Sequence, residues 1–210
     1  MNYKALSNME NQQEYINDLK EIKDIMNRST RFMSLSGLSG VSAGVSALIG
    51  AYFAYEHLYK MGFERNQLDL VNVNYLILIG ALTILFAVGS ALFFTNIESK
   101  KNGVKLWDLQ IKRFISSMMI PLATGGILTL ILVLKGFVGL AAPLTLIFYG
   151  LALVNGSKYT FSDIKSLGII EIVLGLLATQ FIGYGIYFWA VGFGVLHIAY
   201  GIYMYFTNNR

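Results

Sequence analysis

Runs of about 20 residues that hold few charged side chains recur along this chain and constrain its fold more than any other feature. An α-helix rises about 1.5 Å per residue, so such a run crosses a hydrocarbon core roughly 30 Å thick. A transmembrane strand would need about ten residues of alternating polarity, whereas these runs are longer and apolar on all sides. Only 13% of the 210 residues are charged, which is too little polar surface for a water-soluble domain of this size. The chain is therefore predicted to be an all-α integral membrane protein.

Six such runs predict a polytopic bundle of six transmembrane helices within residues 32–206. By these apolar limits, Pro121 falls in the first turns of the third span. A proline is tolerated there because the early amide groups of a helix have no helical partner. The predicted spans cover residues 32–57, 73–95, 116–134, 138–154, 163–183 and 186–206.

The residues before the first span, 1–31, are polar and predict a separate amphipathic helix. Tyr15, Leu19, Ile22 and Met26 recur at helical spacing among mixed charges. Five basic residues are balanced by five acidic ones, so this helix does not resemble one that seeks anionic lipid. We expect it in the cytoplasm, packed on its own bundle or on another protein. Because this leader lacks the pattern of a cleavable signal peptide, the first span should be retained as an anchor.

Basic residues are distributed unevenly between the two sides of the predicted bundle. With six spans, the leader, the second and fourth connections and the C-terminus share one side. That side holds thirteen Lys and Arg residues, whereas the other holds only Lys60, Arg65 and Lys135. Positive charge accumulates on the cytoplasmic side of membrane proteins. We therefore expect a bacterial inner-membrane protein with both termini in the cytoplasm.

The first span carries small residues at four-residue steps on two faces. In lipid, helices associate through close backbone approach and dispersion contact, so small residues mark contact faces. This span is expected either to lie centrally in the bundle or to pair with a second copy. Besides the lipid bilayer, the expected partner is a second copy or another membrane protein. The predicted packing residues are Ser36, Gly40, Gly44, Ala43, Ala47 and Ala51.

Two ionisable residues lie within the last apolar hairpin. A charged carboxylate in hydrocarbon costs several kcal/mol, and such residues face the bundle interior with a partner. If the hairpin turns near Tyr184, Glu171 and His197 each lie thirteen residues from the turn and come level. A turn centred at Phe188 would instead leave His197 beside two other polar residues of the fifth span. A proton or ion site and a structural, hydrogen-bonded carboxyl both remain open. The intramembrane polar candidates are Glu171, His197, Gln180 and Thr179.

No motif in the sequence indicates an enzyme. Residues 40–44, GVSAG, formally match the G-x-S-x-G nucleophile elbow, but they lie within a predicted membrane helix rather than at a strand-to-helix turn. The chain has no cysteine and no P-loop, dinucleotide fingerprint or H-E-x-x-H motif. Glu56 and His57, with Glu64 and Asp69 in the following loop, lack the spacing of a metal site. We expect no catalytic residue, metal or cofactor, and no nucleic-acid partner because topology accounts for the basic residues.

Two segments of the chain resemble each other, and others resemble a known family. IFYGLAL from Ile147 and IAYGIYM from Ile198 share Ile, Tyr and Gly at matching positions, which is typical of repeated helical hairpins. RFMSLSGLSGVSAGVSALIGAYFAY and FWAVGFGVLHIAYGIYM resemble an uncharacterised family of six-span membrane proteins from Bacteroidota. The hairpin repeat is also similar, more distantly, to HdeD-like acid-resistance membrane proteins. The family resemblance covers most of the chain and implies no activity.

Three functions follow as expectations. The first is a non-enzymatic structural or accessory subunit of a membrane assembly, which associates through its small-residue span and its leader helix. The alternative is a small proton- or ion-coupled transporter or channel that uses Glu171 and His197. An intramembrane enzyme has the least support, because no nucleophile, general base and orienting group occur at a recognisable spacing.

Overall fold

The structure is a computed structural model that describes residues 15–20, 22, 36–60, 70–101, 109–160 and 163–208. Within these ranges the chain forms helices joined by short connections, with no strand, so the predicted all-α class is confirmed. Four short segments interrupt or extend the long helices: the 3₁₀ turns η1 (Val138–Leu140) and η2 (Ser157–Tyr159), the helical turn α7 (Gly185–Trp189) and the π-helix η3 (Ala190–Leu196). The long helices are α2 (Gly37–Lys60), α3 (Leu70–Lys101), α4 (Leu109–Leu134), α5 (Ala141–Gly156), α6 (Asp163–Gln180) and α8 (His197–Asn208).

Five helical stretches among the described residues are long and apolar enough to cross a membrane. They are Gly37–Leu58, Val73–Lys101, Leu109–Leu134, Val138–Tyr159 and Gly185–Thr207. The predicted fifth span coincides with α6, which has 18 residues and includes Asp163, Lys165 and Glu171. These charged residues lower its apolar character, so α6 does not belong to the five.

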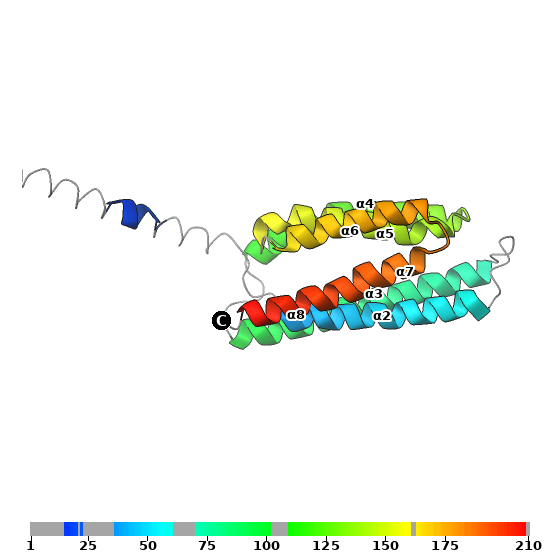
Figure 1. Cartoon of the computed structure of the whole chain (residues 1–210), viewed down its shortest axis with the longest axis horizontal. Helices are drawn as coiled ribbons and strands as arrows, with labels where there is room; N and C mark the ends of the chain where they lie inside the picture. Colours follow the sequence, from blue (N-terminus) through cyan, green and yellow to red (C-terminus); the bar gives the residue numbers. More distant parts are fainter. Residues whose placement is uncertain are drawn as a thin grey trace, which may run out of the picture.

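The long helices form two groups of three (Figure 1). In one group α5 packs between α4 and α6, and in the other α2 packs between α3 and α8. The segments α7 and η3 carry the chain from the first group to the second. The beginning of α2 and the end of α8 lie at the same end of the bundle, where α3 ends and α4 and α6 begin.

Two pairs of glycines bring helix backbones into direct contact. A Cβ atom added to Gly150 of α5 would lie 2.5 Å from the carbonyl oxygen of Gly168 in α6. A Cβ atom on Gly37 of α2 would lie 2.5 Å from the carbonyl oxygen of Gly201 in α8. Real Cβ atoms do not approach backbone so closely, so these four positions require glycine for the observed packing.

The small residues of the first span pack inside the chain. A Cβ atom on Gly40 would lie 3.0 Å from the Cα atom of Gly201, and one on Gly44 would lie 2.7 Å from the carbonyl oxygen of Gly194. The other predicted packing residues are buried or half-buried. Within the chain α2 lies between α3 and α8, and the expected pairing of this span with a second copy stays a prediction. The other four predicted packing residues are Ser36, Ala43, Ala47 and Ala51.

Two further sequence expectations concern the helix before the first span and the GVSAG segment. Of the helix predicted over residues 1–31, residues 15–20 are helical and exposed; most of the remainder, including Met26, lies outside the described residues. Ser42, at the centre of GVSAG, lies inside α2, and its hydroxyl donates to the Ser39 carbonyl at 3.0 Å. It is therefore part of a continuous helix, as predicted.

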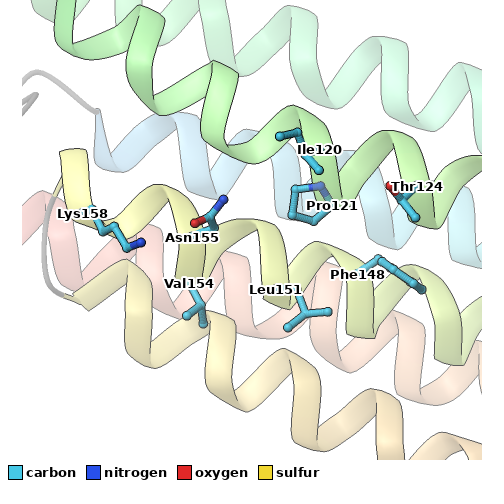
Figure 2. Close-up of a pocket in the computed structure, with 8 residues that line it drawn as sticks. All are labelled: Ile120, Pro121, Thr124, Phe148, Leu151, Val154, Asn155 and Lys158. Carbon is cyan, nitrogen blue, oxygen red and sulfur yellow. The ribbon is translucent and has the colours of Figure 1, made fainter.

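The predicted position of Pro121 near a helix start is wrong. Helix α4 begins at Leu109, seven residues before the predicted limit of 116, because its first turns are polar and extend beyond the apolar run. Pro121 therefore lies inside the helix, where it has no amide hydrogen to donate to the Ser117 carbonyl. The side-chain amide of Asn155 in α5 donates to this carbonyl at 2.7 Å and replaces the missing helical bond. Figure 2 shows Pro121 and Asn155 on facing sides of the two helices.

Asn155→Leu is expected to lower the free energy of unfolding by about 1–3 kcal/mol, because it leaves a carbonyl unpaired within the bundle. In a Pro121→Ala background residue 121 regains its amide hydrogen, so the same substitution should cost less than half as much. Unfolding in detergent, followed by circular dichroism, measures both differences. An equal cost in the two backgrounds would contradict this role of Asn155.

Candidate functional site

Glu171 lies in the middle of α6 and is completely buried, with 0% of its surface exposed. Neither carboxyl oxygen has a hydrogen-bond partner among the described residues. Burial of a carboxyl group without hydrogen bonds is costly, especially when the group is charged. Burial of the Glu171 carboxyl group therefore requires a nearby group that stabilises it by sharing its proton or its charge.

His197 is that neighbour. Its Nδ1 atom lies 3.5 Å from Oε1 of Glu171, within ion-pair distance but without hydrogen-bond geometry. The chain connects α6 to α7 through residues 181–184, with Gly183 at a φ of 111°. The turn thus lies close to Tyr184 rather than Phe188, and the prediction that the hairpin brings Glu171 and His197 together is confirmed.

The π-helix η3 sets the position of the histidine ring. His197 follows η3 directly, and its Nδ1 atom lies 3.0 Å from the Gly192 carbonyl oxygen, five residues earlier. A Cβ atom on Gly192 would lie 2.5 Å from Oε2 of Glu171, so only glycine allows η3 to approach the carboxyl group this closely. π-Helical segments are rare and occur frequently at functional sites.

Tyr149 of α5 completes the site. Its hydroxyl lies 2.7 Å from Nε2 of His197, and the two rings are 5.3 Å apart between centroids. Three separate helical elements, α5, α6 and the η3–α8 segment, thus each contribute one polar side chain. Tyr149 was not among the site residues predicted from the sequence. The only signal was its place in the IFYGLAL segment, where it matches Tyr200 of IAYGIYM.

The hydrogen bonds define the neutral form of the histidine ring. Since a carbonyl oxygen only accepts, Nδ1 carries the hydrogen in its bond to Gly192. Nε2 of the neutral ring then accepts from the Tyr149 hydroxyl. When the ring is protonated, Nε2 donates and the Tyr149 oxygen accepts. Each ring nitrogen can therefore keep its hydrogen bond in both forms, although in the protonated form the hydroxyl hydrogen of Tyr149 must turn away from the ring.

The other predicted polar residues are not part of this cluster. Gln180 ends α6 and is exposed, about 14 Å along the helix axis from Glu171. Thr179 donates its hydroxyl to the Leu176 carbonyl at 2.6 Å, within its own helix. A single hydroxyl bonded one turn back needs no partner elsewhere.

No metal site is seen within the described residues: they contain no group of three His, Asp or Glu side chains that could hold an ion. His57 packs its ring on Tyr75, with 4.1 Å between centroids. Glu64 and Asp69, which the sequence places near His57, lie outside the described residues.

No protein-family model, curated protein or solved structure matches this chain. The resemblance to six-span membrane proteins therefore stays an expectation from the sequence.

Proposed function

We propose that this chain is a small proton-coupled transporter or channel of the membrane, with Glu171, His197 and Tyr149 as its proton-binding site. One observation carries the proposal: the buried Glu171 carboxyl has no hydrogen bond and lies 3.5 Å from the His197 ring. Ionisable residues placed within a membrane bundle are costly and mark proton relays or ion pathways.

The proposed proton pathway continues towards the end of the bundle where the C-terminus lies. Tyr200 follows His197 by one helical turn on α8, and its hydroxyl is buried without a hydrogen-bond partner among the described residues. Tyr200 packs against a buried cluster formed by Leu153 of α5 with Ile164 and Leu167 in the first turns of α6. A hydroxyl at this point provides the next group to which a proton from His197 can move.

The proposal includes six spans, with α6 as the fifth. Helix α6 lies alongside α5, a candidate span, with their backbones in contact at Gly150 and Gly168. Its 18 residues extend about 27 Å, close to the thickness of a hydrocarbon core. Asp163 and Lys165 occupy its first turn, where polar groups can reach the membrane surface.

The proposed orientation places both termini in the cytoplasm of a bacterial cell, with the chain in the inner membrane. The same end of the bundle carries the C-terminus, the start of α2 and the basic residues of several helix ends. An excess of Lys and Arg on one side indicates the cytoplasmic face. The basic residues at this end include Lys100, Lys101, Lys112, Arg113, Lys158 and Lys165.

Proton movement into liposomes tests the proposed function. The purified protein is reconstituted into liposomes that contain a pH-sensitive dye, and a potassium diffusion potential drives protons inward. Wild-type protein should acidify the lumen faster than protein-free liposomes, and Glu171→Gln should reduce the rate to the protein-free level. Glu98→Gln is the matched control, because it makes the same chemical change on α3, which packs chiefly on α2 and lies outside the proposed pathway.

Two results would contradict the proposal. One is wild-type acidification no faster than that of protein-free liposomes. The other is a Glu171→Gln rate equal to that of the wild type and of Glu98→Gln. Circular dichroism and a monodisperse elution profile establish that the compared variants are folded.

A second candidate function is an accessory subunit of a membrane assembly or a homo-oligomer. The observation that favours it is that α3 packs chiefly on α2 and leaves Gly80 and Gly89 open, with nothing within 4 Å of an added Cβ atom. Small residues of this kind mark contact faces between helices in lipid. The native mass of the purified protein distinguishes a monomer in detergent from such an assembly. The exposed large side chains of α3 include Leu78, Leu82, Leu85, Phe86 and Phe93.

A further inference from the structure

An open groove lies between α4 and α5 (Figure 2). Apolar side chains from both helices line it, among them Ile120 of α4 and Leu151 and Val154 of α5. Lys158 of η2 lies at one end, next to Asn155. None of the residues that line this groove belongs to the Glu171 site, although α5 contributes side chains to both.

The walls of the groove are held by contacts between the two helices. Gly125 of α4 packs on Phe148, where an added Cβ atom would lie 2.2 Å from that side chain. Gly156 of α5 packs on Phe114 and Met118 in the same way. Asn155 is tied to α4 through its hydrogen bond to the Ser117 carbonyl. The two helices that line the groove are thus in contact at several points along their length.

The polarity of the groove indicates its occupant. Its apolar part runs along two helices that are long and apolar enough to cross a membrane. The exposed Lys158 lies at the end of the bundle where the basic residues gather, and it forms no ion pair with another described residue. A lipid with an anionic headgroup has the complementary arrangement, with apolar chains below a negatively charged phosphate.

We propose that the groove between α4 and α5 binds one anionic glycerophospholipid. An acyl chain packs along Ile120, Leu151 and Val154, and the phosphate pairs with the Lys158 ammonium group. A zwitterionic lipid fills the same apolar groove but carries a compensating cation on its headgroup. Lys158 should therefore select for net negative charge rather than for acyl-chain length.

Native mass spectrometry with added lipid tests the proposal. Phosphatidylglycerol and phosphatidylcholine of identical acyl chains are titrated onto the full chain in detergent, and the bound fractions give the two affinities. Wild-type protein should prefer phosphatidylglycerol. Lys158→Gln should lower the affinity for this lipid by about fivefold, as expected for one basic residue at the membrane surface. Phosphatidylcholine binding should stay unchanged.

Two further variants locate the effect. Lys165→Gln removes the same charge from α6 near the same end of the bundle and should leave lipid preference unchanged. Leu151→Trp places a larger side chain in the groove and should lower the affinity for both lipids. If Leu151→Trp does not fold, the comparison of Lys158→Gln with Lys165→Gln by itself tests whether the lipid binds at Lys158.

Three outcomes would overturn the proposal. The first is equal binding of the two lipids by the wild type. The second is an equal loss in Lys158→Gln and Lys165→Gln, which would indicate diffuse attraction to a basic surface. The third is a wild-type complex that carries a second polypeptide and no lipid, and loses that polypeptide in Leu151→Trp. None of these outcomes depends on proton movement through the Glu171 site.

Discussion

Replacement of Gly150 by leucine is expected to separate α5 from α6 and to lower the free energy of unfolding by about 3 kcal/mol or more. The reason is the nature of the obstacle. The added Cβ atom would lie 2.5 Å from the Gly168 carbonyl oxygen and 2.9 Å from the Ile172 amide nitrogen. Backbone atoms cannot move aside as a flexible side chain can, so the helices must shift. Thermal unfolding in detergent measures the loss.

The chain offers matched controls for this substitution. Gly80 of α3 and Gly126 of α4 are also helical, yet an added Cβ atom at either would meet nothing within 4 Å. Leucine at these two positions should change stability by less than about 0.5 kcal/mol, as exposed substitutions usually do. If Gly80→Leu and Gly150→Leu were equally destabilising, the loss would reflect glycine content rather than close packing.

His197→Leu is expected to destabilise the protein by about 2–4 kcal/mol. It leaves the Glu171 carboxyl, the Tyr149 hydroxyl and the Gly192 carbonyl without the ring that each one faces, and each buried polar group left unpaired costs about 1–3 kcal/mol. If Glu171 and His197 stabilise each other, His197→Leu should cost about 1–3 kcal/mol less in a Glu171→Leu background. Unfolding of the four proteins in one detergent gives this coupling energy.

Thr179 provides the control pair for the coupling measurement. It lies on the same helix as Glu171 but bonds only to its own backbone, at the Leu176 carbonyl. Glu171→Leu and Thr179→Ala should therefore add within about 0.5 kcal/mol. Additivity of Glu171→Leu with His197→Leu to the same precision would show that the two buried groups do not interact energetically, whatever their distance.

The equal depth of Glu171 and His197 was predictable from the sequence for a turn at Tyr184, because depth in a hairpin depends only on the distance of each residue from the turn. Their contact was not, because it also depends on which way each side chain points. The apolar runs likewise predicted the helices, since a bilayer requires long stretches with internally paired backbone groups. The sequence does not, however, distinguish glycines that face open space from glycines that are packed against a neighbouring helix. Gly126 faces open space, whereas Gly125 beside it is packed against Phe148.

The limits of α4 were not predictable from apolar character alone. A helix can continue beyond the hydrocarbon boundary through polar residues, so the end of an apolar run does not mark the end of the helix. The early start at Leu109 placed Pro121 inside the helix and made the Ser117 carbonyl dependent on Asn155. That dependence joins two helices, and it becomes visible only when both are positioned.

By itself, then, the sequence determined the helical class and the approximate apolar limits, because both depend on local composition. It also showed that two residues of one hairpin come level if the turn lies at Tyr184, because this depends only on counting from the turn. Tertiary structure decided that α2 lies between α3 and α8, that Tyr149 faces His197, and that a groove opens between α4 and α5. These features depend on the rotation of each helix about its own axis. In lipid that rotation is set by which small side chains allow close backbone contact, and by the few polar groups that must find partners on other helices.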